Sequence, residues 1–216
     1  MLTTYASFLK EFVSMRVIDP SRREQIVDTA ARLFGQGRYH EVRMEDIAQA
    51  AGVAKGTLYR YFDDKEDLYL GLILTASNRL FQEVDREIKK TADGEQQVSI
   101  YVEGTIRFFA RFPYFLELVQ RIETGAAPQR LAALKESRDR FFRLIEGIVQ
   151  ALIDSGKYAT SRPDLAALAL SGMTRQIMRF HAQPFNAEMG QWIVQQFLHG
   201  LRPVEARAHA ARRAAK

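Results

Sequence analysis

The chain has 216 residues, of which 47% are hydrophobic and 26% are charged, the composition of an ordinary globular protein with one or two domains. It contains no cysteine, which excludes a disulfide framework and a zinc site built on thiolates. The formal net charge of +5 does not by itself indicate DNA binding, because most of the excess lies in the Ala/Arg-rich residues 201–216 and not in residues 20–67.

The N-terminal extension, residues 1–19, does not have the pattern of a signal peptide. Its opening, "MLTTYASFLKEF", lacks a basic lead and is interrupted by Lys10 and Glu11. The longest apolar stretch of the chain, "LYLGLILTA" from Leu68, is shorter than the roughly 20 residues that a membrane-spanning helix needs. We therefore expect a cytoplasmic protein, with residues 201–216 as a basic, solvated tail.

Three short helices are expected between residues 20 and 67. The first begins at about Ser21, ends near "GQGR" and is marked by apolar side chains at helical spacing: Ile26, Ala30, Leu33 and Phe34. The second runs from about Met44 to Ala50, Gly52 makes a turn, and "KGTLYRYF" (residues 55–62) forms the third. Two short helices joined by a glycine turn and braced by a preceding helix form a helix-turn-helix, whose second helix enters the DNA major groove.

The third helix has a polar side that suits this groove, which is about 12 Å wide. With about 100° of turn per residue, Leu58 and Phe62 share one side and are expected to be buried. Gly56 and Thr57 point away from them, as does Arg60, which we interpret as an ordinary solvated charge. Base edges or phosphates are expected to meet the following residues, unless the two tyrosines are only half-buried packing groups: Lys55, Gly56, Thr57, Tyr59, Tyr61 and Lys65.

Helical periodicity continues to the end of the chain and predicts six more helices. They cover about residues 64–90, 96–112, 114–123, 129–153, 164–181 and 187–199. Asp64 is placed to cap the first of them. Because no alternating strand pattern interrupts the series, the sequence predicts an all-α fold with about nine helices.

Aromatic residues are concentrated in "TIRFFARFPYFLELVQRIE", on both sides of Pro113. They form either a helical core or one wall of a ligand cavity between helices, in which Glu117, Gln120 or Arg121 would orient a polar group. The candidates for ligand binding, with facing residues from later helices included, are Phe108, Phe109, Phe112, Phe115, Arg121, Phe141, Met173 and Ile177.

A homodimer is expected, because two recognition helices related by a two-fold axis read two half-sites of a palindromic operator. Helix 164–181 carries small residues that let another helix approach, and helix 187–199 adds large apolar ones. Some of these side chains must belong to the core of a single chain. The candidates for the interface are Leu165, Ala169, Gly172, Trp192, Ile193 and Phe197.

No sequence motif indicates catalysis. A phosphate-binding glycine loop, a G-x-S-x-G elbow and an H-E-x-x-H pair are absent, and nothing positions Glu117 and Glu123 as an acid–base pair. The four histidines lie far apart without the spacing of metal ligands, so neither a metal nor a cofactor is expected. An adaptor that uses its helices only for protein contacts is the other class to weigh.

Residues 22–73 resemble the N-terminal domain of TetR-family transcriptional regulators. The segments "AARLFGQGRYHEV", "DIAQAAGV", "GTLYRYF" and "KEDL" follow in the order and at the spacing typical of that family. The resemblance implies base-edge or groove contacts from Lys55, Gly56, Thr57 and Tyr59. It implies phosphate contacts from Tyr61 and Lys65, with Arg43 at the start of the second helix as a further candidate. Arg43 and Ala54 depart from the family pattern, which often has a hydroxyl N-cap at both positions.

The same resemblance implies what the rest of the chain does. Residues 20–67 would be the DNA-binding domain and residues 68–200 an effector-binding and dimerising domain. The function implied is a repressor released from double-stranded DNA by a small, mostly apolar ligand, with helix 64–90 as the lever between the domains. A constitutive DNA binder, a regulator controlled by a protein partner, and an activator remain alternatives.

Overall fold

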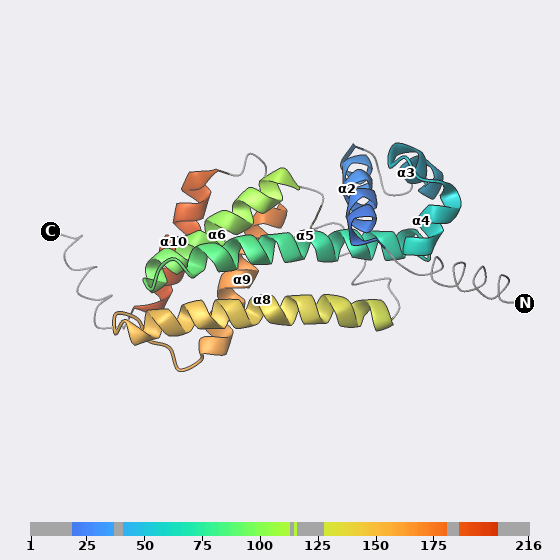
Figure 1. Cartoon of the computed structure of the whole chain (residues 1–216). Helices are drawn as coiled ribbons and strands as arrows, with labels where there is room; N and C mark the ends of the chain where they lie inside the picture. Colours follow the sequence, from blue (N-terminus) through green and yellow to red (C-terminus); the bar gives the residue numbers. More distant parts are fainter. Residues whose placement is uncertain (1–18, 37–40, 113–114, 116–127, 181–185, 203–216) are drawn as a thin grey trace, which may run out of the picture. The chain divides into compact units, whose positions relative to one another are not determined.

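Helices account for almost all of the chain that the structure describes. The computed structural model describes residues 19–36, 41–112, 115, 128–180 and 186–202, and over these residues it contains no strand (Figure 1). The helices are α2 (Pro20–Gln36), α3 (Met44–Ala50), α4 (Lys55–Tyr61), α5 (Lys65–Ile88), α6 (Gly94–Arg111), α8 (Pro128–Asp154), α9 (Pro163–Phe180) and α10 (Ala187–Leu201). The predicted all-α fold class is confirmed, whereas the helix predicted over residues 114–123 lies outside the described residues except for Phe115.

The chain divides into two compact units, Met1–Leu72 and Ile73–Lys216. The first contains α2, α3 and α4, and the second contains α6, α8, α9 and α10. α5 begins in the first unit and ends in the second. Within the described ranges, no helix is long and apolar enough to cross a membrane.

The core of the first unit joins the apolar sides of its short helices. Ile26, Ile47 and Leu58 are completely buried there. Between α3 and α4, Gly52 has a φ of 64°, in the left-handed region that a side chain disfavours, so the predicted glycine turn is confirmed. Nε2 of Gln25 on α2 donates a hydrogen bond of 3.2 Å to the carbonyl of Ala51, which ties α2 to this turn.

α5 begins with carboxylates that accept backbone hydrogen bonds. Oδ1 of Asp64 accepts from the N–H of Asp67 at 2.7 Å, and Oδ2 of Asp67 accepts from the N–H of Asp63 at 3.1 Å. The expected Asp64 cap is confirmed. Negative charge at this end of a helix is also favoured by the helix dipole.

Gly71 on α5 permits a close approach inside the first unit. A Cβ atom at this position would lie 2.9 Å from Cε1 of Phe62 and 3.0 Å from Nη2 of Arg23. The Arg23 guanidinium lies 5.0 Å from the centre of the Phe62 ring, within the range of a cation–π contact. The segment that follows α4 is therefore held between α2 and the start of α5.

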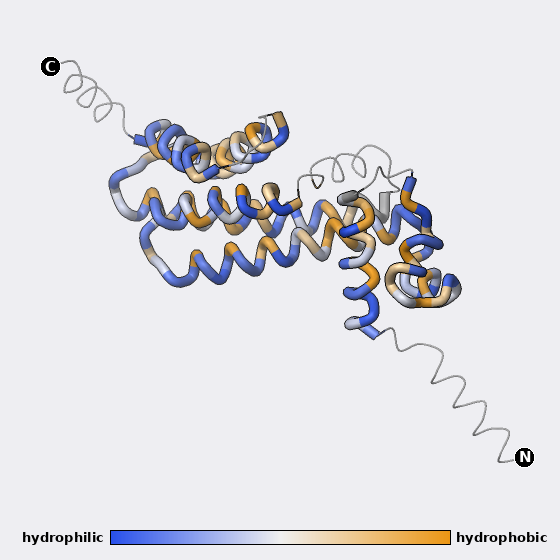
Figure 2. The backbone as a smooth tube through the Cα atoms, turned by 90° about the horizontal axis from the view of Figure 1, so that it is seen from above, coloured by the Kyte–Doolittle hydropathy of each residue, from blue (hydrophilic) through white to orange (hydrophobic). Residues whose placement is uncertain are grey.

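The second unit packs α8 against α9, α6 against α10, and α6 against both α8 and α9. Figure 2 shows hydrophobic positions recurring along the long helices, with hydrophilic positions between them. A Cβ atom at Gly94 would lie 2.8 Å from the backbone nitrogen of Leu152, so a residue without a side chain brings the start of α6 against the backbone of α8. The core side chains include Val98, Val102, Ile145, Ile148, Val149, Leu152 and Leu170.

The residues predicted for a dimer interface fall into two groups. Ile193 and Phe197 are 0% and 5% exposed within the single chain, so their assignment to an interface is wrong: α10 turns them onto its own core. Leu165 and Trp192 are about half exposed, and Ala169 is exposed. The spacing of apolar residues in α10 indicated that one face of the helix is buried. Spacing alone could not show that α6 of the same chain packs against that face.

Candidate DNA-binding surface and effector cavity

α4 buries one side and leaves the other open. Leu58 is 0% exposed and Phe62, which follows the helix, is 1% exposed, whereas Tyr59 is 41% exposed. Lys55, Gly56 and Arg60 are exposed as well, and Thr57 and Tyr61 are half-buried. The inward and outward sides predicted from the helical period are therefore those of the structure. A Cβ atom at Gly56 would meet nothing within 4 Å, so the exposed side of α4 simply has no side chain at this position.

An ion pair joins the first residue of α4 to α3. Nζ of Lys55 lies 2.5 Å from Oε1 of Glu45, and both side chains are more than half exposed. The hydrogen bond from Lys55 lowers the pKa of Glu45, and the same bond raises the pKa of Lys55. Lys55 also lies 5.9 Å from the centre of the Tyr59 ring. The sequence analysis missed Glu45, because a separation of ten residues across a turn has no recognisable spacing.

The two helix starts in this motif lack the hydroxyl caps of the common pattern. Arg43 precedes α3, and a guanidinium group cannot accept a hydrogen bond. The hydrogen bond at this end is instead donated by the backbone N–H of Arg43 to Oδ2 of Asp46, at 3.0 Å. Ala54 precedes α4 and makes no side-chain cap. Its carbonyl accepts from the N–H groups of Thr57 and Leu58 at 2.9 and 3.1 Å. The side chain of Arg43 is exposed.

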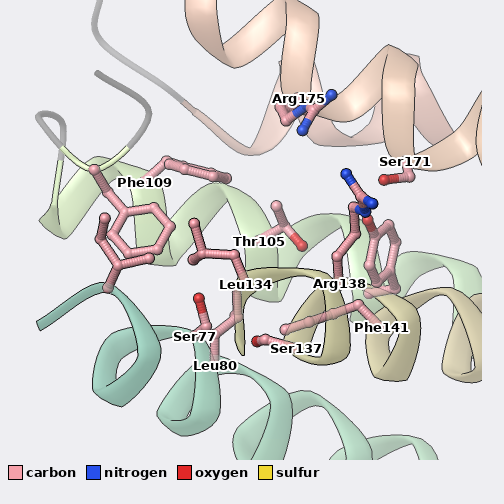
Figure 3. Close-up of a pocket in the computed structure, with 13 residues that line it drawn as sticks. Ser77, Leu80, Thr105, Phe109, Leu134, Ser137, Arg138, Phe141, Ser171 and Arg175 are labelled. Atoms are coloured by element: carbon pink, nitrogen blue, oxygen red, sulfur yellow. The ribbon is translucent and has the colours of Figure 1, made fainter. Parts of the chain in front are cut away.

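A cavity of about 160 Å³ lies in the second unit between α5, α6, α8 and α9 (Figure 3). Most of its lining surface is apolar, although five of the lining residues contribute a hydroxyl and two contribute a guanidinium. The apolar lining residues are Ile73, Leu80, Phe109, Phe115, Leu134 and Phe141. The polar ones are Ser77, Tyr101, Thr105, Ser137, Arg138, Ser171 and Arg175.

One buried hydroxyl on the cavity wall has no standard hydrogen bond. Thr105 is 6% exposed, and its Oγ1 has no hydrogen-bond partner of standard geometry among the described residues. Burial raises the pKa of the neighbouring Tyr101, while interactions with the hydroxyls of Ser171 and Thr105 oppose the shift. The phenol is therefore neutral at physiological pH and is available as a hydrogen-bond donor or acceptor.

Both units match families of known proteins. Residues 26–72 match the family described as bacterial regulatory proteins, tetR family, and residues 91–183 match the tetracyclin repressor-like C-terminal domain. The chain belongs to the TetR family. It is a helix-turn-helix transcriptional regulator, and the resemblance read from residues 22–73 is confirmed.

Named relatives of this TetR-family chain include a regulator of fatty acid metabolism and a transcriptional repressor. The fatty acid metabolism regulator protein of Bacillus subtilis is 26% identical over 134 residues, covering 62% of this chain and 69% of the relative. The transcriptional repressor KstR of Mycobacterium tuberculosis is 32% identical over 136 residues, covering 63% and 60%. The crystal structure of FadR from Bacillus subtilis in complex with stearoyl-CoA has a TM-score of 0.72 at 20% identity, covers 83% of this chain and 99% of that chain, and shares the fold.

The aromatic residues expected to bind a ligand in this TetR-family regulator lie in different surroundings. Phe109, Phe115 and Phe141 line the cavity. Phe108 is buried behind them, with its ring centre 5.0 Å from that of Phe115, and Phe112 packs on Phe108 at 5.1 Å. Neither Phe108 nor Phe112 is among the lining residues.

The remaining ligand candidates lie away from the cavity lining or outside the described residues. Met173 is half-buried without lining the cavity, and Ile177 lines a separate groove with Trp192. Arg121, expected as the polar group, lies outside the described residues. The cations on the cavity wall are Arg138 and Arg175, which the sequence analysis missed.

Proposed function

We propose that this regulator is a dimeric repressor that leaves its operator when a small, mostly apolar molecule fills the cavity of the second unit. The observation that carries the proposal is this cavity, whose lining is chiefly aromatic and aliphatic, in a chain that also presents an open recognition helix. A relative named as a repressor and a similar fold solved with stearoyl-CoA support the same function. Release would be a shift of population towards a form that the ligand prefers and the operator does not.

α5 is the element through which the two events would be linked. It is one helix from Lys65, next to the recognition helix in the chain, to Ile88, and Ile73 and Leu80 of the same helix line the cavity. A ligand that moves these side chains biases the helix as a whole, because a continuous hydrogen-bonded helix is stiff along its axis. A coupling of about 1–3 kcal/mol would weaken operator binding roughly 5- to 150-fold.

DNA binding is tested with an operator selected from random sequence. Tyr59→Ala and Lys65→Ala should each weaken binding by about tenfold, because the first removes a contact in the groove and the second a contact to a phosphate, whereas substitutions of Lys55 and Thr57 should change sequence preference. Lys89→Ala, which removes an exposed lysine near the end of α5, is the control of equal charge and should bind as the wild type does. Unchanged affinity of both Tyr59→Ala and Lys65→Ala would overturn this docking.

Dimerisation through α9 and α10 is the second part of the proposal. Large apolar side chains remain exposed on these helices: Leu165, Leu168, Phe180 and Trp192. A Cβ atom at Gly172 would meet nothing within 4 Å inside the chain, so Gly172→Arg should fold and yet prevent a partner from approaching α9. Gly147→Arg on α8, where space is equally open, is the matched control. Sedimentation at micromolar concentration should give a monomer for the first variant and a dimer for the second.

A further inference from the structure

The two arginines of the cavity share one end of it. Figure 3 shows the guanidinium groups of Arg138, from α8, and Arg175, from α9, near Ser171, with Phe109 and Leu80 towards the opposite end. Neither guanidinium has an acidic partner within 4.0 Å among the described residues. Both arginines are exposed to solvent, so water screens their mutual repulsion. An anion that lies between them would still be attracted by both positive charges.

The buried hydroxyl of Thr105 is a further polar group on the cavity wall. It makes no hydrogen bond of standard geometry among the described residues, although it interacts with the Tyr101 phenol, so a ligand oxygen could improve its hydrogen bonding. Thr105 lines the same cavity as the arginines. The wall therefore offers hydroxyl donors from α6 and α9 and charged donors from α8 and α9 to one end of a ligand.

The size of the cavity limits the apolar part of that ligand. Its volume of about 160 Å³ resembles the engineered cavity of about 150 Å³ that takes up benzene. It is smaller than the roughly 300 Å³ or more typical of sites for drug-sized ligands. A ring or a short branched chain of about six non-hydrogen atoms fits, whereas a long alkyl chain would need the helices to separate.

We propose that the cavity is a site for a small organic acid, in which a short or aromatic apolar group lies between Phe109, Phe115 and Phe141 and a carboxylate lies between Arg138 and Arg175. This deepens the proposed function, on which it rests for the consequence of binding. The arginines supply charge-assisted hydrogen bonds and decide that the ligand is an anion, while the aromatic wall decides its size.

The same two arginines also line an open groove between α8 and α9, together with Lys135 and Asp139. A larger head, such as a phosphate-bearing carrier attached to the acid as a thioester, would leave the cavity beside Lys135 on α8, because Leu168 and Gly172 on the α9 side of the groove belong to the proposed dimer interface. The free acid places a carboxylate next to its apolar group, whereas the thioester places a neutral carbonyl there and carries its anionic phosphates farther along the groove. They differ in whether binding needs Lys135, which lines the groove and not the cavity.

The experiment measures binding of defined probes by calorimetry and by the rise in melting temperature. Benzoate, hexanoate and benzoyl-coenzyme A should compete for one site, and benzamide, the neutral counterpart of benzoate, should bind at least about tenfold more weakly. Stearate should not compete below its micelle concentration. Equal binding of benzoate and benzamide, or stearate as the tightest ligand, would overturn the proposal, as would failure of both benzoate and hexanoate to bind.

The variants assign the roles of the polar groups. Arg138→Gln and Arg175→Gln should each weaken benzoate binding about 10- to 100-fold, and Thr105→Val about two- to tenfold without loss of stability. Arg143→Gln, an exposed arginine on α8 that does not line the cavity, is the matched control and should bind benzoate as the wild type does. Lys135→Gln should weaken the thioester and leave benzoate unchanged if the carrier form is the ligand.

The outcome for DNA separates this inference from the proposed function. If benzoate binds through the arginines but leaves operator affinity unchanged, the acid site stands and ligand-controlled release is wrong. If a neutral ligand releases the operator and both arginine variants respond to it normally, release stands and the acid site is wrong.

Discussion

The two units of this regulator place their functional groups in opposite ways. In the first, five of the seven candidate DNA contacts are neighbours on the seven-residue helix α4, outside the side that Leu58 buries, and Arg43 and Lys65 lie at the starts of the adjacent helices. In the second, the cavity takes its lining from four helices, and its two arginines are far apart in the chain. A surface that reads DNA can be carried by one rigid helix, whereas a site that encloses a small molecule needs walls on all sides.

The sharpest way to separate the two units is to weaken one core at a time. Leu58 and Leu152 are both 0% exposed, one in each unit, so truncation to alanine should cost about 2–5 kcal/mol in either place. Leu58→Ala should abolish operator binding and spare binding of acid probes. Leu152→Ala should weaken binding of acid probes and, because the second unit carries the proposed dimer interface, operator binding as well. Loss of both activities in both variants would mean that the units do not fold separately.

The single tryptophan makes this measurement specific. Trp192 lies in the second unit, so its fluorescence follows that unit, while circular dichroism follows the helices of both. For Leu58→Ala, helix content should begin to fall at a lower urea concentration than the tryptophan signal changes. For Leu152→Ala, the tryptophan transition should itself move to lower urea.

A smaller effect is expected from Glu45, which acts only on the DNA-reading unit. Glu45→Gln removes the partner of Lys55 and a negative charge beside the recognition helix, so operator affinity should rise about two- to fivefold. Glu66→Gln, at an exposed position in the first turn of α5, is the matched change of charge. A gain of the same size in both variants would mean that only overall charge matters.

The smallest effect concerns Tyr101 and appears only at alkaline pH. Burial raises the pKa of this phenol above its usual value of about 10, so the unfolded chain loses the proton first as the pH rises. Its contribution to stability is present below pH 10 and is lost as the pH rises through the folded pKa. Tyr101→Phe should therefore flatten the fall of melting temperature between pH 9 and pH 11, and parallel curves for both proteins would contradict the assignment.

The sequence predicted the first unit almost residue by residue, for a physical reason. The helix over 44–50, the glycine turn and the inward Leu58 follow from local rules of periodicity and backbone conformation, and the structure has all three. Glu45 was missed because its pairing with Lys55 depends on the angle between α3 and α4, which no local rule fixes.

The sequence was less informative about the second unit, because the lining of its cavity depends on which helices pack together. The aromatic cluster near residue 109 indicated a cavity wall, but Arg138 and Arg175 become part of one site only when α8 packs against α9. Ile193 was assigned to an interface because its spacing gives an apolar face without naming the neighbour that covers it. Periodicity thus predicts burial and leaves the partner open.

The short Lys55–Glu45 contact has a consequence for how binding responds to salt. Affinity for DNA normally falls as salt rises because each bound cationic side chain frees counterions condensed on the phosphates, and the slope on a logarithmic plot reports how many side chains take part. In the proposed docking, Lys55 would reach the DNA only by leaving a carboxylate that is already its counterion. Salt weakens that internal pair as well as the contact to DNA, so the two effects partly cancel. The measured slope will therefore indicate fewer contacts between cationic side chains and phosphates than the operator complex makes.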